Sequence, residues 1–118
     1  MGYYSDVALA MQKKDYAEML DKAKLIDVPD VRREVLELLD KQGEKYESEE
    51  HIVLYWENIK WYPIFPEIEW IKENKPETYA FLRVGEDMDD VEYSSGAASS
   101  EEDMDGLLRL DRSIAWDL

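Results

Sequence analysis

Hydrophobic side chains recur at helical spacing in two stretches between residues 15 and 42. The apolar faces consist of Tyr16, Met19, Leu20, Ala23 and Ile26 in the first stretch and of Val31, Val35, Leu38 and Leu39 in the second. Asp15 and Glu18 have the spacing of an acidic capping box, and Gly43 is a natural end. Because proline fits the first position of a helix, Pro29 predicts either a second helix or a break in one long helix.

Strands are predicted where β-branched and aromatic residues gather or where apolar and polar residues alternate. The predicted strands cover residues 3–11, 52–62, 78–84, 91–93 and 108–118, and the last places Arg112 on its apolar face. In residues 52–62 the alternation of apolar and polar positions shifts by one residue at Glu57 and Asn58. This shift indicates either a tight turn or one strand with a bulge. The lack of glycine in this dipeptide favours the bulge.

Polar and proline-containing segments connect these elements. Residues 45–50 are polar and are expected to be exposed. Pro66 can begin a short helix over 67–74, which Pro76 would end. Ser, Gly and Ala alone make up the start of the segment 94–105, which we expect to be a mobile loop.

The order of these elements and the composition predict one α+β domain over residues 1–118. The 118 residues are 45% hydrophobic and 12% aromatic, which is enough for a core. The simplest packing is a mainly antiparallel sheet of about four to five strands with two or three helices on one face. The lack of cysteine excludes a disulfide framework, a thiolate metal site and a cysteine nucleophile.

The chain has no recognisable targeting signal. Its first residues lack a basic region followed by a long apolar core, so we expect no signal peptide. Asp6 stands where a myristoylation motif at Gly2 needs Ser or Thr. No run approaches the roughly 20 apolar residues of a membrane helix. We therefore expect a cytoplasmic protein with no membrane association.

Negative charge is concentrated in the second half of the chain. The formal net charge is -15, with 13 acids and 8 bases in residues 1–50 but 16 acids and 6 bases in residues 51–118. The segment 86–105 has no Lys, Arg or His, and its nine carboxylates are Glu86, Asp87, Asp89, Asp90, Glu92, Glu101, Glu102, Asp103 and Asp105. Such a surface repels DNA and RNA and attracts proteins that bind them.

Catalytic motifs are missing from the sequence. His51 is the only histidine, and no neighbouring motif supplies it with a nucleophile or an acid. The five scattered glycines match neither the Walker nor the dinucleotide-binding pattern. We therefore predict a non-enzymatic protein with no catalytic residues and no cofactor.

A calcium loop is only partly matched. Glu101, Asp103, Asp105 and Gly106 fall at positions 1, 3, 5 and 6 of that motif, but Arg112 stands where a bidentate Glu is needed. The cluster at residues 86–90 has no basic neighbour that could help to hold a magnesium-bound phosphate. We therefore assign no metal ligands.

Aromatic residues gather between positions 55 and 70. Base stacking on such a segment needs a basic groove, and here Lys60 is nearly alone. Core packing accounts for most of this set, and the remainder could anchor a protein partner. Trp56, Trp61 and Tyr62 are the candidate anchors.

Two interpretations of the acidity remain open. Net charge far from zero keeps a small protein soluble. Alternatively, carboxylates on a rigid edge imitate phosphates, which lie on the order of 6–7 Å apart along one strand, and compete for a basic groove. For this second interpretation the candidate partner-binding residues are Glu86, Asp87, Asp89, Asp90 and Glu92.

Three segments carry a resemblance to a protein group. They are residues 1–10, then Tyr55-Trp56 with Lys60-Trp61-Tyr62-Pro63, then residues 81–87 with Asp89-Asp90. Over most of residues 1–92 the chain resembles small acidic proteins encoded by bacteriophages and prophages. The resemblance implies a bacterial or phage cytosolic setting, and because the group has no agreed activity it carries over no catalytic residues. It also implies antagonism of host enzymes that act on nucleic acid, such as restriction and CRISPR systems.

The sequence therefore favours a phage protein that binds and inhibits a basic host nucleic-acid-binding defence protein, without binding nucleic acid itself. This would be an anti-CRISPR or anti-restriction protein and a DNA mimic. The alternative is a phage protein–protein interaction or oligomeric accessory module, such as a homodimer, that uses the aromatic segment 55–70. In that alternative the acidity serves solubility only.

Overall fold

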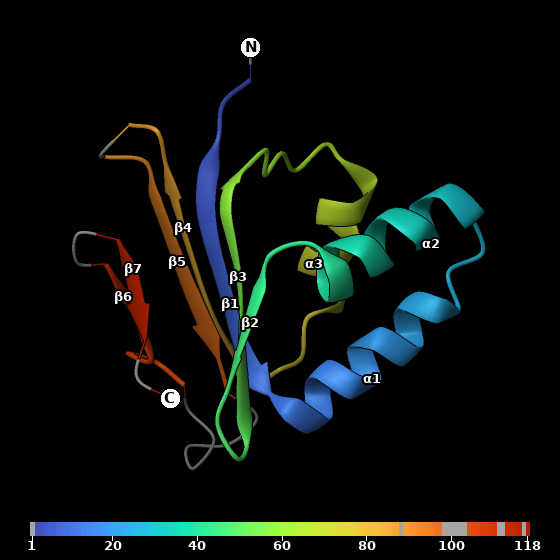
Figure 1. Ribbon diagram of the computed structural model, residues 1–118, viewed down its shortest axis with the longest axis horizontal. Coiled ribbons are helices and arrows are strands. Elements are labelled where there is room, and N and C mark those ends of the chain that lie inside the picture. The colour runs from blue at the N-terminus through green and yellow to red at the C-terminus, as the bar shows by residue number, and fades with distance from the viewer. Residues whose placement is uncertain (1, 88, 98–103, 111–112, 117) are drawn as a thin grey trace.

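The computed structural model describes residues 2–87, 89–97, 104–110, 113–116 and 118. Within these residues the chain forms a five-stranded antiparallel sheet with strand order β2-β3-β1-β4-β5, here called the large sheet, and a two-stranded sheet of β6 and β7. Figure 1 shows the helices on one side of the large sheet and β6 and β7 on its other side. The predicted α+β class, with a mainly antiparallel sheet and helices on one face, is confirmed.

The elements have the following bounds. The strands of the large sheet are β1 (Ser5–Gln12), β2 (Glu44–Glu47), β3 (His51–Ile59), β4 (Tyr79–Gly85) and β5 (Val91–Gly96). The helices are α1 (Lys13–Lys24), α2 (Pro29–Leu36) and α3 (Pro66–Asn74), and α2 continues into the π-helical turn η1 (Glu37–Lys41). The small sheet consists of β6 (Leu108–Leu110) and β7 (Ile114–Trp116).

The central strand β1 is buried on both of its faces. Leu9 belongs to the core between the large sheet and the helices, whereas Ala8 and Ala10 belong to the core beneath the small sheet. Because both faces are covered, the strand is apolar at nearly every position, which explains why its alternation is imperfect. The small alanines allow the small sheet to pack closely against this face.

The prediction of a helix boundary at Pro29 is confirmed, but the prediction that Asp15 caps the first helix is wrong. α1 and α2 are separate helices, and Pro29 lies at the start of α2. However, α1 begins at Lys13, so Asp15 lies inside the first turn instead of capping it. β1 leads directly into α1, and the Lys13 amide at the junction donates to the Glu50 carbonyl at 2.8 Å. α3 follows Pro66 as predicted.

The predicted bulge lies at Glu57 and Asn58. Ser5 pairs with Ile59 and Val7 pairs with Trp56. Between these two pairs β3 contains one more residue than β1, which is a β-bulge. Asn58 has a φ of 56°, a left-handed conformation that asparagine tolerates better than most residues. β3 ends at Ile59, so the prediction that residues 60–62 belong to this strand is wrong.

Three further strand predictions are corrected. Residues 45–47 of the polar segment 45–50 are exposed as expected, but they belong to the edge strand β2 (Glu44–Glu47). β5 continues to Gly96, through the first residues of the predicted loop 94–105; residues 98–103 of that loop lie outside the described residues. The predicted strand 108–118 is a pair of antiparallel strands, in which Leu108 faces Trp116. Alternation cannot separate one strand from two, because both arms of a hairpin alternate in the same way.

Candidate functional site

The five carboxylates predicted for partner binding come together where β4 turns into β5. The Gly85 amide donates to the Asp90 carbonyl at 2.8 Å, and the Asp90 amide donates to the Asp87 carbonyl at 2.9 Å. Since Ser5 pairs with Gly85, this turn lies at the end of the large sheet where β1 begins. The sheet therefore fixes the place from which these side chains project.

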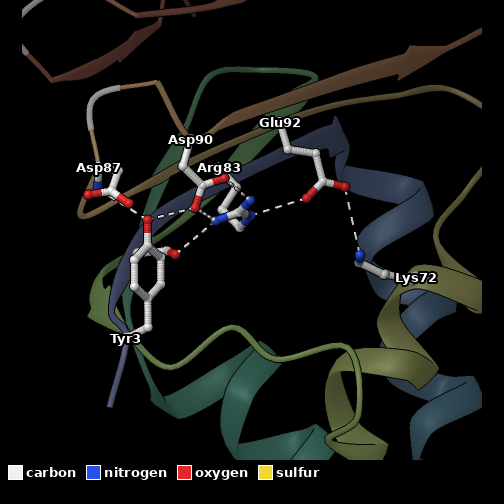
Figure 2. Close-up of polar contacts among 7 residues, drawn as sticks. Tyr3, Lys72, Arg83, Asp87, Asp90 and Glu92 are labelled. Atoms are coloured by element: carbon white, nitrogen blue, oxygen red, sulfur yellow. Dashed lines mark hydrogen bonds and ion pairs between the residues drawn. The ribbon is translucent and has the colours of Figure 1, made fainter. Parts of the chain in front are cut away.

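Arg83 of β4 is the centre of the site (Figure 2). Its Nη2 donates to Asp90 Oδ1 at 2.7 Å and its Nη1 to Asp90 Oδ2 at 3.1 Å, a bidentate pair. Its Nε donates to Glu92 Oε1 at 3.1 Å, and its Nη1 also donates to Ser5 Oγ at 3.1 Å. The Arg83 side chain is 16% exposed, while those of Asp90 and Glu92 are 36% and 42% exposed, so these charge-assisted bonds are only partly shielded from water.

Lys72 of α3 adds a second cation, with its Nζ 3.7 Å from Glu92 Oε2. Glu92 therefore bridges an arginine of the sheet and a lysine of the helix layer (Figure 2). The N-terminal segment braces the turn from the other side. The Tyr3 hydroxyl donates to Asp90 Oδ2 at 2.7 Å and accepts from the Asp87 amide at 3.1 Å. The Tyr4 amide donates to Glu86 Oε1 at 3.0 Å.

The network changes the proton affinity of its members. The hydrogen bonds from Arg83, and then the one from Tyr3, lower the pKa of Asp90 to about 2. The hydrogen bond to Asp90 is also the largest cause of a raised pKa at Arg83. Both groups therefore stay charged at neutral pH, and the pair remains closed.

This shift predicts a component of acid sensitivity. Because the folded-state pKa of Asp90 is depressed, its contribution to stability is complete above its unfolded value of about 4 and is lost as the pH falls towards about 2. Chemical denaturation of the wild type and of Asp90→Asn, compared between pH 6 and pH 2, measures this component. The difference in stability between the two proteins should shrink across that window. A difference that stays constant would contradict the ion pair.

The five predicted carboxylates thus divide into two groups. Asp90 and Glu92 are half-buried and form ion pairs with Arg83 and Lys72, so their charge is partly neutralised inside the protein, and their role in partner binding stays a prediction. The acid-rich segment contains no base of its own, but the fold brings bases from β4 and α3 to it. The remaining three, Glu86, Asp87 and Asp89, are exposed. We call these three residues the acidic turn.

The predicted aromatic anchors are largely core residues. Trp56 and Trp61 are 2% and 4% exposed, so their side chains are not presented to a partner and that prediction is corrected. The Trp56 Nε1 donates to the Leu38 carbonyl at 2.9 Å, which satisfies its polar atom inside the core. Tyr62 is half-buried, and its hydroxyl accepts from the Tyr3 amide at 2.6 Å. It therefore helps to hold the N-terminal segment that braces the acidic turn.

A different aromatic group lies between the small sheet and the large sheet, with Tyr55 and Trp116 half-buried and Tyr46 exposed. The Trp116 ring of β7 has centroid distances of 4.8 Å to Tyr46 of β2 and 5.5 Å to Tyr55 of β3. Burial, followed by the charges of nearby carboxylates, raises the pKa of Tyr55 to about 12. Sequence reasoning missed this group because its members are far apart in the chain and Tyr46 lies in a segment without a strand pattern.

The remaining candidate chemistry concerns metal ions, membranes and the single histidine. Within the part of the chain that the structure describes, no group of three or more His, Asp or Glu residues could hold a metal ion. Residues 101–103 of the partial calcium loop lie outside that part, while Asp105 Oδ1 accepts from the Tyr93 hydroxyl at 2.6 Å. Among the described helices, none is long and apolar enough to cross a membrane. His51 is half-buried at the start of β3.

Comparison with known proteins leaves the residues themselves as the basis for a function. No family model, no curated protein and no solved structure matches this chain.

Proposed function

We propose that this chain is a non-enzymatic phage protein that binds and inhibits a host nucleic-acid-binding defence protein through the acidic turn. The observation that carries the proposal is the braced geometry of this turn. Glu86, Asp87 and Asp89 are exposed, while Arg83, Asp90 and Tyr3 fix the backbone from which they project. Carboxylates held in this way lose little conformational freedom when a partner binds.

The charge of the whole chain supports the same partner class. At a net charge of -15, the protein repels nucleic acid and attracts a basic surface from a distance. Attraction of this kind speeds the encounter with the partner and weakens as salt is added. A groove that binds phosphates offers such a surface, so occupation of the groove by the acidic turn would exclude DNA or RNA.

The resemblance of residues 1–92 to small acidic phage proteins supports the setting of the proposal. In a bacterial host, the basic proteins that act on foreign DNA are restriction enzymes and CRISPR effectors. These are the targets that a phage gains from inhibiting. They therefore define the panel in which the proposed activity is sought.

A plating assay tests the proposed inhibition. Bacteria that carry a single restriction or CRISPR system are challenged with a sensitive phage, with and without expression of this chain. Expression should raise the plating efficiency in at least one system of the panel, because its nuclease no longer binds phage DNA. A strain without any defence system is the control. Equal plating with and without the chain in every system would contradict the proposal.

A second candidate function is an oligomeric accessory module. The observation that favours it is the exposed Tyr46 of the edge strand β2, which packs beside the half-buried Trp116 and Tyr55. Exposed strand edges can pair with a second copy of the chain, and surface aromatics anchor interfaces. Mass measurement in solution at low and high salt distinguishes this candidate, because an apolar dimer persists at high salt.

A further inference from the structure

The outer side of the edge strand β2 is unpaired in the part of the chain that the structure describes. In the large sheet this strand pairs with β3 alone. All four of its residues, Glu44–Glu47, are exposed. The backbone N–H and C=O groups on the outer side of such a strand can pair with another strand. A further strand can therefore be added to the large sheet at β2.

The side chains of β2 combine an exposed aromatic ring with two opposite charges. Tyr46 lies on the face of the small sheet, where its ring centroid is 4.8 Å from that of Trp116. Lys45 and Glu47 lie on the other face, because their partners in β3 belong to the core beneath the helices. Lys45 Nζ donates to Asp40 Oδ1 of its own chain at 2.6 Å. This bond does not exclude a second carboxylate, because an ammonium group has three donors.

The backbone restricts how two copies of β2 can pair with each other. The N–H and C=O groups of successive residues point alternately to the two sides of a strand, so the groups that β3 leaves unpaired belong to every second residue of β2. In an antiparallel pair of two copies, even-numbered residues therefore face even-numbered residues, and odd-numbered residues face odd-numbered ones. Within the four residues of β2, only registers centred on position 45 or position 46 bring three residues of each copy face to face.

Charge selects between these two registers. Centring on position 45 would place Lys45 opposite Lys45 of the second copy, and like charges directly opposite each other are destabilising. Centring on position 46 places Lys45 opposite Glu47 of the second copy, and the two-fold symmetry repeats this pair. The same register places Tyr46 opposite Tyr46. Opposite charges and aromatic pairs stabilise neighbouring strands, so the register centred on Tyr46 is favoured.

We propose that two copies of this chain pair antiparallel through β2, with Tyr46 at the centre, and join their large sheets into one. This inference rests on the second candidate function, the oligomeric module, and supplies its interface and register. It does not involve the acidic turn, which belongs to the connection between β4 and β5. The net charge of -15 opposes association of two copies, but at physiological salt this repulsion is screened beyond about 8 Å.

Sedimentation equilibrium at physiological salt tests this pairing with charge-reversed variants. The mass of the wild type should rise from one chain towards two as its concentration increases. Glu47→Lys should weaken the dimer by about tenfold or more, because each of the two pairs loses an attraction and gains a repulsion. Lys45→Glu should do the same. Glu73→Lys makes the same charge change at an exposed position of α3, so this control should dimerise at least as tightly as the wild type.

An equimolar mixture of Glu47→Lys and Lys45→Glu separates the pairing from a defect in folding. In a mixed dimer each cation again faces an anion, so the mixture should regain the wild-type affinity that each variant lacks alone. A wild type that is monomeric at every concentration would overturn the proposal together with the oligomeric candidate. A wild-type dimer that both variants leave intact, or a mixture that does not regain the affinity, would overturn the pairing through β2 and leave an oligomeric module with another interface.

Discussion

Replacement of Glu86, Asp87 and Asp89 by lysine is expected to abolish the protection that this chain gives a phage against the inhibited defence system. Replacement of the same residues by Gln and Asn is expected to weaken binding of the nuclease of that system by about 100-fold. Close charge pairs across an interface contribute roughly 1.5 kcal/mol or more each, and every 1.4 kcal/mol is a factor of ten, so the loss of two well-placed pairs already gives this effect. Calorimetry or surface plasmon resonance against the purified nuclease measures it.

A matched control uses the opposite end of the large sheet. Glu47, Glu49 and Glu50 are exposed and lie near the β2–β3 connection, where Gln12 pairs with His51. Their replacement by glutamine removes the same net charge from a different place. This variant should bind within about threefold of the wild type, because distant charges are screened at physiological salt. Equal losses in both triple variants would show that only total charge matters.

The second large effect is on stability. Arg83→Met should lower the free energy of unfolding by about 2 kcal/mol, because it leaves Asp90 without its bidentate partner and Glu92 with Lys72 alone. A side chain that is 16% exposed is partly screened by solvent, which holds the cost below that of a fully buried pair. For a chain of this size the melting temperature should fall by roughly 8 °C.

Arg33→Met is the control for this change. Arg33 also has two carboxylate neighbours, Asp30 at 3.4 Å and Glu34 at 3.9 Å, but its side chain is 60% exposed. Exposed pairs contribute about 0–1 kcal/mol, so thermal unfolding should be nearly unchanged. Arg83→Met should in addition weaken partner binding, since the acidic turn loses its brace. A stable Arg83→Met protein with full binding would remove Arg83 from the account.

The fold was predictable where local chemistry agrees with tertiary packing. Pro29 and Pro66 mark the starts of α2 and α3, and the change of apolar phase at Glu57 marks the bulge in β3. β2 was not predictable, because an exposed edge strand needs no apolar face and takes its pairing from β3. The same holds for β6 and β7, whose alternation suits one strand as well as two.

The candidate site was only half predictable. The sequence places Arg83 on the same side of its strand as Tyr79 and Phe81, and the pairing of β4 confirms this face. Its partners could not be inferred in the same way. Tyr3 and Asp90 are 87 residues apart in the chain, and Lys72 reaches Glu92 from another layer of the fold.

The tryptophans illustrate the same limit. A run that contains Trp56 and Trp61 is compatible with a core or with a surface anchor, since both bury aromatic area. The choice depends on whether η1 and α3 cover the residues. The Leu38 carbonyl of η1, which accepts the Trp56 Nε1 hydrogen bond, places Trp56 in the core.

The central claim is that the acidic turn takes the place of nucleic acid on a basic partner. The most direct measurement is a competition titration, in which labelled duplex DNA is added to the complex of this chain with the nuclease identified by the plating assay. The account predicts mutually exclusive binding, with the DNA concentration needed for half-displacement rising in proportion to the concentration of this chain. A ternary complex, with DNA and this chain bound to one nuclease at the same time, would contradict it.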